Sequence, residues 1–118
     1  DIYIAAKFGI LEMLKGGVVF CNDMYRNPEV VMKAIDEMGI RGVVSDPEID
    51  NGHPELLEQK KKSVLDFIER ENINENRIMK AIACHSVYTL SDDFLQFYSD
   101  LAKKYNMYIH IMASETYY

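Results

Sequence analysis

The sequence contains no tryptophan, three prolines and only two cysteines among its 118 residues. Two cysteines cannot build the disulfide framework of a small secreted domain, and Cys21 and Cys84 both lie in apolar, strand-like runs. We therefore expect two buried thiols in a reducing compartment, which implies a cytoplasmic location. No apolar run reaches the roughly 18 residues of a membrane span, so we expect no membrane partner.

Positive charge is also scarce. Lysine and arginine number 13 against 19 aspartates and glutamates, which gives a formal net charge of −6 and a pI near 5.0. Affinity for nucleic acid depends on Lys and Arg side chains that neutralise phosphates, so the balance excludes a large phosphate-binding surface. The basic run Lys60–Lys62 lies among acidic residues and is typical of a solvated helix face. We expect no nucleic-acid partner.

Low-complexity tracts and Gly/Ser linkers are absent, and 48% hydrophobic with 27% charged residues is ordinary for a globular protein. A chain of 118 residues supports one domain but falls well short of the roughly 250 residues of a complete α/β barrel. The first residue is Asp1 rather than Met, and a helical pattern begins at Ile2. We expect the natural chain to begin upstream.

Apolar periodicity predicts helices and strands in strict alternation. The expected helices cover 2–15, 27–39, 55–71 and 91–102, and the expected strands cover 18–21, 41–45, 78–84 and 107–113. The run at 18–21 is typical of a strand buried on both faces. Residues 46–54 carry two prolines and a glycine and are predicted to be loop. The alternation predicts an α/β fold with parallel strands, either a small open sheet or roughly half of a TIM-type (β/α)8 barrel.

Polar side chains follow the predicted strands at the carboxyl ends, where α/β proteins keep their chemistry. Ser114, Glu115 and Thr116 place a carboxylate and two hydroxyls after the last strand, and His85 ends the one before it.

Three of these strand exits resemble the motifs of one family, in order and at fitting spacings. Gly17–Tyr25 resembles a Gly-Thr-Thr-Thr-Phe-Asn-Asp-Met-Tyr run, His85–Thr89 resembles His-Ala-Pro-Tyr-Thr, and Ile109–Thr116 resembles Ile-His-Ile-His-x-Ser-Glu-Thr. These motifs belong to the amidohydrolase superfamily, in its branch of methylthioadenosine/S-adenosylhomocysteine deaminases and chlorohydrolases. The resemblance covers essentially the whole chain.

The resemblance implies a barrel of eight strand-helix units with one divalent metal, Zn or Fe, that activates water. The water would attack an aromatic ring carbon of an adenosine-like or triazine-like small-molecule substrate and expel ammonia or chloride. The resemblance runs from the helix before the family's second strand to the end of the fifth. We therefore expect residues 1–118 to be a single partial-barrel segment, with about four strands and four helices, of a larger amidohydrolase domain, and to be inactive in isolation.

Two site residues follow from the resemblance. His85 falls on the family's substrate-contacting histidine, and Glu115 falls on the carboxylate that contacts substrate and shuttles protons. The alternative for His85 is a strand-end histidine bonded to a backbone carbonyl, and the alternative for Glu115 is a helix-capping carboxylate. The motif context favours the functional interpretation of both residues.

The chain departs from the family at the metal and at one substrate contact. The family's fifth-strand ligand lies three residues before the glutamate, where this chain has Met112, a weak ligand for Zn²⁺ or Fe²⁺. His110 is only a weak candidate ligand. It faces the same side of the strand as Met112 but lies about 6 to 7 Å from it along the strand. We expect no tightly bound metal. Asp46 stands where the deaminases carry an arginine, and Val87 replaces a proline.

Two further hypotheses stay open. The chain is either a degenerate, non-catalytic binding or structural module of the same lineage, favoured by Met112 and Asp46, or an autonomous small α/β domain that binds an unrelated ligand. A partial barrel exposes two unpaired strand edges, so the partial-barrel hypothesis predicts a homo-oligomer formed through those edges.

Overall fold

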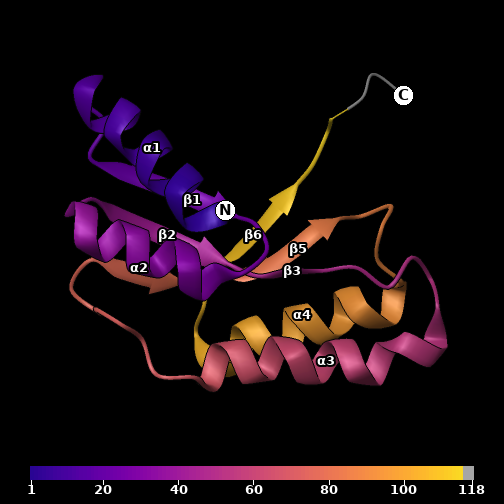
Figure 1. Cartoon of the computed structure of the whole chain (residues 1–118). Coiled ribbons are helices and arrows are strands. Elements are labelled where there is room, and N and C mark those ends of the chain that lie inside the picture. The colour runs from indigo at the N-terminus through magenta and orange to yellow at the C-terminus, as the bar shows by residue number, and fades with distance from the viewer. Residues whose placement is uncertain (116–118) are drawn as a thin grey trace. The chain divides into compact units, whose positions relative to one another are not determined.

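Residues 1–115 are described by the computed structural model of the chain, in which helices and strands alternate (Figure 1). The strand pairings within this range are parallel, which confirms the predicted α/β class. The elements in chain order are α1 (Ile2–Lys15), β1 (Phe20–Met24), α2 (Pro28–Met38), β2 (Arg41–Ser45), β3 (Pro47–Glu48), α3 (Pro54–Glu69), β4 (Ile78–Lys80), β5 (Ile82–Ser86), α4 (Asp92–Tyr105) and β6 (Ile109–Met112).

The chain forms two compact units. The first contains Asp1–Ser45 and Glu71–Lys80, with a sheet in the order β1-β2-β4. The second contains Asp46–Arg70 and the residues from Ala81 onward, with a sheet in the order β3-β5-β6. A single residue separates β2 from β3 and β4 from β5, so the run predicted at 78–84 is divided between the units at Ala81.

In the first unit, α2 begins and ends where the sequence predicts. Pro28 occupies its first turn, and Gly39 ends it with a φ of 76°, a conformation that favours glycine. The helix packs on β2, where a side chain at Gly42 would place its Cβ 2.9 Å from Ile35 Cδ1. Glycine at this position therefore permits the close approach. The buried apolar residues of the unit are Ile10, Val31, Met32, Ala34, Ile35, Ile40, Val44 and Ile78.

The prediction that residues 18–21 are buried on both faces is wrong. Val19 is 68% exposed and Phe20 is 53% exposed, while Cys21 is half-buried. The reason is that, within residues 1–115, β1 is the edge strand of its sheet and pairs with β2 alone. The preceding helix α1 has Ile10 as its one buried residue. Short-range apolar character does not reveal whether a strand lies at the edge or the centre of a sheet.

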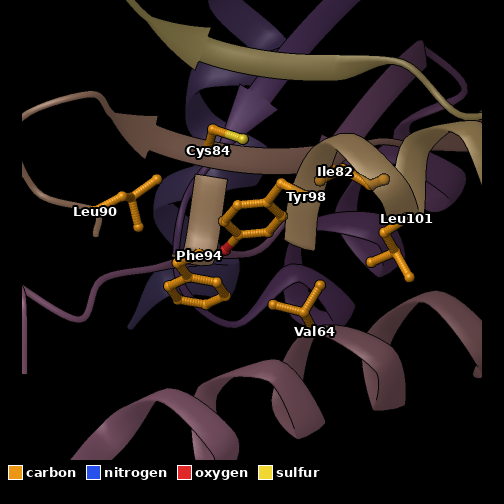
Figure 2. Close-up of a cluster of buried hydrophobic side chains, with 7 residues drawn as sticks. All are labelled: Val64, Ile82, Cys84, Leu90, Phe94, Tyr98 and Leu101. Carbon is orange, nitrogen blue, oxygen red and sulfur yellow. The ribbon is translucent and has the colours of Figure 1, made fainter. Parts of the chain in front are cut away.

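The core of the second unit forms between α3, α4 and β5 (Figure 2). The rings of Phe94 and Tyr98 on α4 stack with their centroids 4.6 Å apart, and both side chains are fully buried. Cys84 lies in the same cluster, and burial raises the pKa of its thiol to about 12, so the group is a neutral core side chain. The cluster consists of Val64, Ile82, Cys84, Leu90, Phe94, Tyr98 and Leu101.

The prediction that residues 46–54 are entirely loop is also wrong, because Pro47 and Glu48 form β3. Pro47 pairs with Ala83 and Glu48 pairs with Cys84. A proline is tolerated there because β3 is an edge strand. On the outer side of an edge strand no neighbouring strand needs the N–H that proline lacks.

A buried carboxylate fixes the start of α4. Asp50 is 1% exposed, and its carboxylate accepts hydrogen bonds from the Ser91 N–H at 2.9 Å and the Ser91 hydroxyl at 2.5 Å. The Ser91 Oγ in turn accepts the Phe94 N–H at 3.3 Å, which makes it the helix cap. Burial alone would raise the pKa of Asp50, but the hydrogen bonds from Ser91 and Gly52 outweigh burial and hold it below its ordinary value.

A second carboxylate, Asp46, is half-buried and has the opposite shift. Lys60 forms an ion pair with Glu48 at 2.5 Å, so its charge is already engaged. Burial raises the pKa of Asp46 to about 6, the nearby charge of Glu48 adds to the rise, and Lys60 opposes it.

None of the helices in the described part of the chain combines the length and apolar character that a membrane crossing requires.

Replacing Asp50 by alanine is expected to lower the free energy of unfolding by about 2–3 kcal/mol, because the Ser91 N–H and hydroxyl lose their buried acceptor. Urea unfolding at neutral pH measures the change. The depressed pKa means that this contribution is present above the unfolded pKa and is lost as pH falls through the folded value. The exposed Asp93 is the control, and its replacement by alanine should cost less than about 1 kcal/mol.

Asp46→Asn is expected to stabilise the chain above pH 6 and to leave it unchanged below about pH 4. Because its pKa is raised to about 6, Asp46 stays protonated to a higher pH in the folded chain than in the unfolded chain. The wild type therefore loses stability as the pH rises from the unfolded pKa to the folded pKa. The loss should be on the order of 1–2 kcal/mol. Urea unfolding across this pH range tests it, and an unchanged slope of stability against pH in Asp46→Asn would contradict the assignment.

Candidate functional site

The parallel pairing of β5 with β6 places the carboxyl ends of both strands at one edge of the second unit's sheet. Ala83 pairs with His110, and Cys84 pairs with Ile111. The register then shifts, so that Met112 lies opposite Ser86. Residues 87–89 and 113–115 therefore leave the sheet at the same edge. The second segment contains Glu115, and the first follows His85 closely in the chain.

Glu115 is exposed, and its Oε2 accepts a hydrogen bond of 2.7 Å from the hydroxyl of Tyr88. Tyr88 is 70% exposed, and its hydrogen bond to Glu115 raises the pKa of its hydroxyl. This bond joins the segment after β5 to the segment after β6. Sequence analysis included Tyr88 only as part of a motif and missed its contact with Glu115. A helix that Glu115 could cap would begin after residue 115, so the capping alternative lies outside the described residues.

His85 is half-buried near the end of β5 and is held by hydroxyl groups. Its Nδ1 lies 2.9 Å from the Oγ1 of Thr89 and 3.3 Å from the Oγ of Ser86. The two hydroxyl oxygens lie 2.7 Å apart, and Ser86 is fully buried. The ring therefore has hydroxyl partners rather than the backbone carbonyl that the alternative interpretation expects. Within the described residues, no hydrogen bond joins His85 directly to Glu115.

His110 and Met112 are both half-buried on β6. Their two-residue spacing gives them the same face of the strand. Across residues 1–115, no three or more His, Cys, Asp and Glu side chains are grouped so that they could hold a metal ion. A zinc site takes three or four protein ligands, so the described residues do not by themselves fit a resident zinc or iron ion.

Asp46, the other predicted departure, lies on the chain between β2 and β3, and its charged neighbours are Glu48 and Lys60. Val87 lies beside Tyr88 in the chain and is 60% exposed, so the edge after β5 carries an exposed apolar side chain. In the first unit, the hydroxyl of the buried Ser45 at the end of β2 donates a hydrogen bond of 3.0 Å to the Asp23 carbonyl. The sequence did not predict this contact.

Residues 1–118 match the family model described as the amidohydrolase family. The chain is 36% identical over 115 residues to a 5-methylthioadenosine/S-adenosylhomocysteine deaminase of Archaeoglobus fulgidus, with 98% of this chain and 27% of that protein covered. It is 39% identical over 116 residues to a 5′-deoxyadenosine deaminase of Methanocaldococcus jannaschii, with 98% and 28% covered. The chain therefore spans little more than a quarter of the length of these relatives.

Solved structures show the same fold. An adenosine deaminase from Xanthomonas campestris with bound zinc superposes with a TM-score of 0.78 at 23% identity, over 98% of this chain and 27% of that one. A zinc-complexed atrazine chlorohydrolase from Arthrobacter aurescens superposes with a TM-score of 0.78 at 18% identity, over 93% of this chain and 29% of that one. At these identities the likeness concerns the fold alone. These proteins are TIM-barrel amidohydrolases, and the part of each that is covered agrees with the predicted partial barrel.

The three strand-exit motifs, the parallel strand-helix architecture and the match over residues 1–118 agree with one another. The chain belongs to the amidohydrolase family.

Proposed function

We propose that residues 1–118 are the substrate-contacting segment of an amidohydrolase that hydrolytically removes a substituent from an aromatic ring, with His85 and Glu115 in contact with the substrate. The observation that carries the proposal is the shared edge after β5 and β6, where the hydroxyl of Tyr88 donates to Glu115. The chain alone holds no catalytic metal tightly and does not turn over substrate.

The relatives favour an adenosine-like substrate over a triazine-like one. Proteins that are 36% and 39% identical to this chain carry the names of deaminases that act on adenosine derivatives. The chlorohydrolase is 18% identical and shares the fold. Deamination is therefore the first reaction to assay, and the leaving group is ammonia.

Glu115 is the group proposed to move protons, and its setting is suited to that task. A carboxylate that takes a proton from one group and passes it to another needs access to both, and Glu115 is exposed. The Tyr88 hydroxyl donates to Oε2 and fixes that carboxylate oxygen, and we propose that Oε1 faces the substrate. Tyr88 orients the carboxylate, and we propose it as a positioning residue.

His85 is proposed to bind the substrate, because its ring is held from one side. Thr89 and Ser86 occupy Nδ1, so Nε2 is the ring nitrogen that is available to a ligand. The neighbouring exposed Val87 and Tyr88 supply apolar surface of the kind that packs on an aromatic base.

A degenerate, non-catalytic role is the second candidate. Met112 occupies the position at which the family resemblance implies a metal ligand, and the carboxylate of Asp46 is half-buried beside Glu48 and Lys60. In this second proposal the edge after β5 and β6 retains binding without turnover. We further propose that β6, which pairs with β5 on one side only, offers its other edge to a second copy of the chain.

A chimera separates the two candidates. Residues 1–118 replace the matching segment of the Methanocaldococcus jannaschii enzyme, and deamination of 5′-deoxyadenosine is measured together with the zinc content. We expect Met112→His in this chimera to raise activity by about 100-fold or more, because even residues that only support a ligand change activity 10–100-fold. In the activated chimera, Glu115→Gln should lower kcat by about 10²–10⁴-fold.

Glu75→Gln, at an exposed turn residue, is the matched control and should leave activity unchanged. A folded, zinc-loaded Met112→His chimera without activity would contradict the catalytic proposal and favour the degenerate one. Full activity in the chimera that retains Met112 would overturn the assignment of that position.

A further inference from the structure

The three polar side chains at the end of β5 share contacts whose protons can be counted. The Ser86 Oγ also lies 3.3 Å from His85 Nδ1 and interacts with the hydroxyl of Tyr88. The Oγ1 of Thr89 lies 3.2 Å from the Ser86 carbonyl oxygen, 2.7 Å from the Ser86 Oγ and 2.9 Å from His85 Nδ1. A carbonyl only accepts hydrogen bonds, and each hydroxyl has one proton to donate. Ser86 is fully buried, so its hydroxyl cannot turn to bulk water instead.

One proton arrangement places a hydrogen in each of these three contacts. The Thr89 hydroxyl donates to the Ser86 carbonyl, the Ser86 hydroxyl donates to Thr89, and the His85 Nδ1–H donates to Thr89. If Nδ1 were the acceptor, the proton would have to come from Thr89 or from Ser86. If Thr89 donated to Nδ1, no proton would lie between the Thr89 Oγ1 and the Ser86 carbonyl oxygen, which are 3.2 Å apart. If Ser86 donated to Nδ1, no proton would lie between the Ser86 Oγ and the Thr89 Oγ1, which are 2.7 Å apart.

We propose that the Ser86–Thr89 hydroxyl pair holds neutral His85 in the Nδ1–H tautomer, so that Nε2 accepts a hydrogen bond from an O–H or N–H of the substrate. Thr89 and Ser86 are positioning residues that act through His85. The substrate part of this inference rests on the proposed function. An adenosine-like substrate offers such donors on its sugar hydroxyls and its exocyclic amine, and a ligand that has only acceptors there is discriminated against.

The tautomer itself is tested by nitrogen-15 NMR of the chain with labelled histidine, at a pH where the ring is neutral. The protonated and the unprotonated ring nitrogens differ strongly in chemical shift, and His85→Gln identifies the signals by their loss. We expect protonated Nδ1 and unprotonated Nε2 for His85. The reverse pattern would overturn the inference, whatever the activity of the chimera.

Variants of Thr89 then test its role. Thr89→Val removes the hydroxyl at nearly constant volume and should shift the His85 signals away from the Nδ1–H pattern, whereas Thr89→Ser should keep it. In the Met112→His chimera, Thr89→Val should lower kcat/KM about tenfold, the size of one lost hydrogen bond, and Thr89→Ser should restore it. An Nδ1–H pattern that persists in Thr89→Val would overturn the positioning role of Thr89.

The two proposals fail in different ways. An inactive Met112→His chimera with the Nδ1–H pattern intact contradicts the proposed function and leaves the tautomer standing. An active chimera with an Nε2–H pattern contradicts only the inference about Thr89 and Ser86.

Discussion

The parallel register between β5 and β6 determines which side chains meet at the candidate site. Ile82 and Cys84 face the buried cluster, so a one-residue slip of β5 would turn both out of the core and turn His85 and Ala83 into it. Burial of apolar side chains thus fixes the orientation of a histidine that contributes nothing to the core. The segments that follow both strands then emerge at one edge because the strands run in parallel.

The packing beneath this edge has its own anchor. Asp50 holds Ser91, Ser91 caps α4, and the stacked Phe94 and Tyr98 on that helix cover β5. Thr89 lies two residues before Ser91, so the hydroxyl that contacts His85 is close in the chain to the serine that Asp50 holds. The backbone N–H of Asn51, next to Asp50, also donates to the Thr89 carbonyl at 3.0 Å, which joins the cap of α4 to the turn that carries Thr89.

Much of the architecture could be predicted from the sequence because its signals are local. The proline start and glycine end of α2 and the serine cap of α4 lie where the sequence places them. The exposure of residues 18–20 and the short strand at Pro47 could not be predicted, since both depend on which strand is at the edge of a sheet. At the candidate site, the motifs predict His85 and Glu115 as contact residues. The hydrogen bonds of His85 to Thr89 and of Glu115 to Tyr88 depend on distances that no spacing reveals.

In the proposed function, His85 and Glu115 contact one substrate from two neighbouring strands. The most direct test is a double-mutant cycle in the Met112→His chimera, with kcat/KM for 5′-deoxyadenosine measured for His85→Gln, Glu115→Gln and the double variant. Residues that act together on one bound substrate give non-additive losses, so the double variant should lose clearly less than the sum of the two single losses in free energy. Strictly additive losses would contradict a shared site.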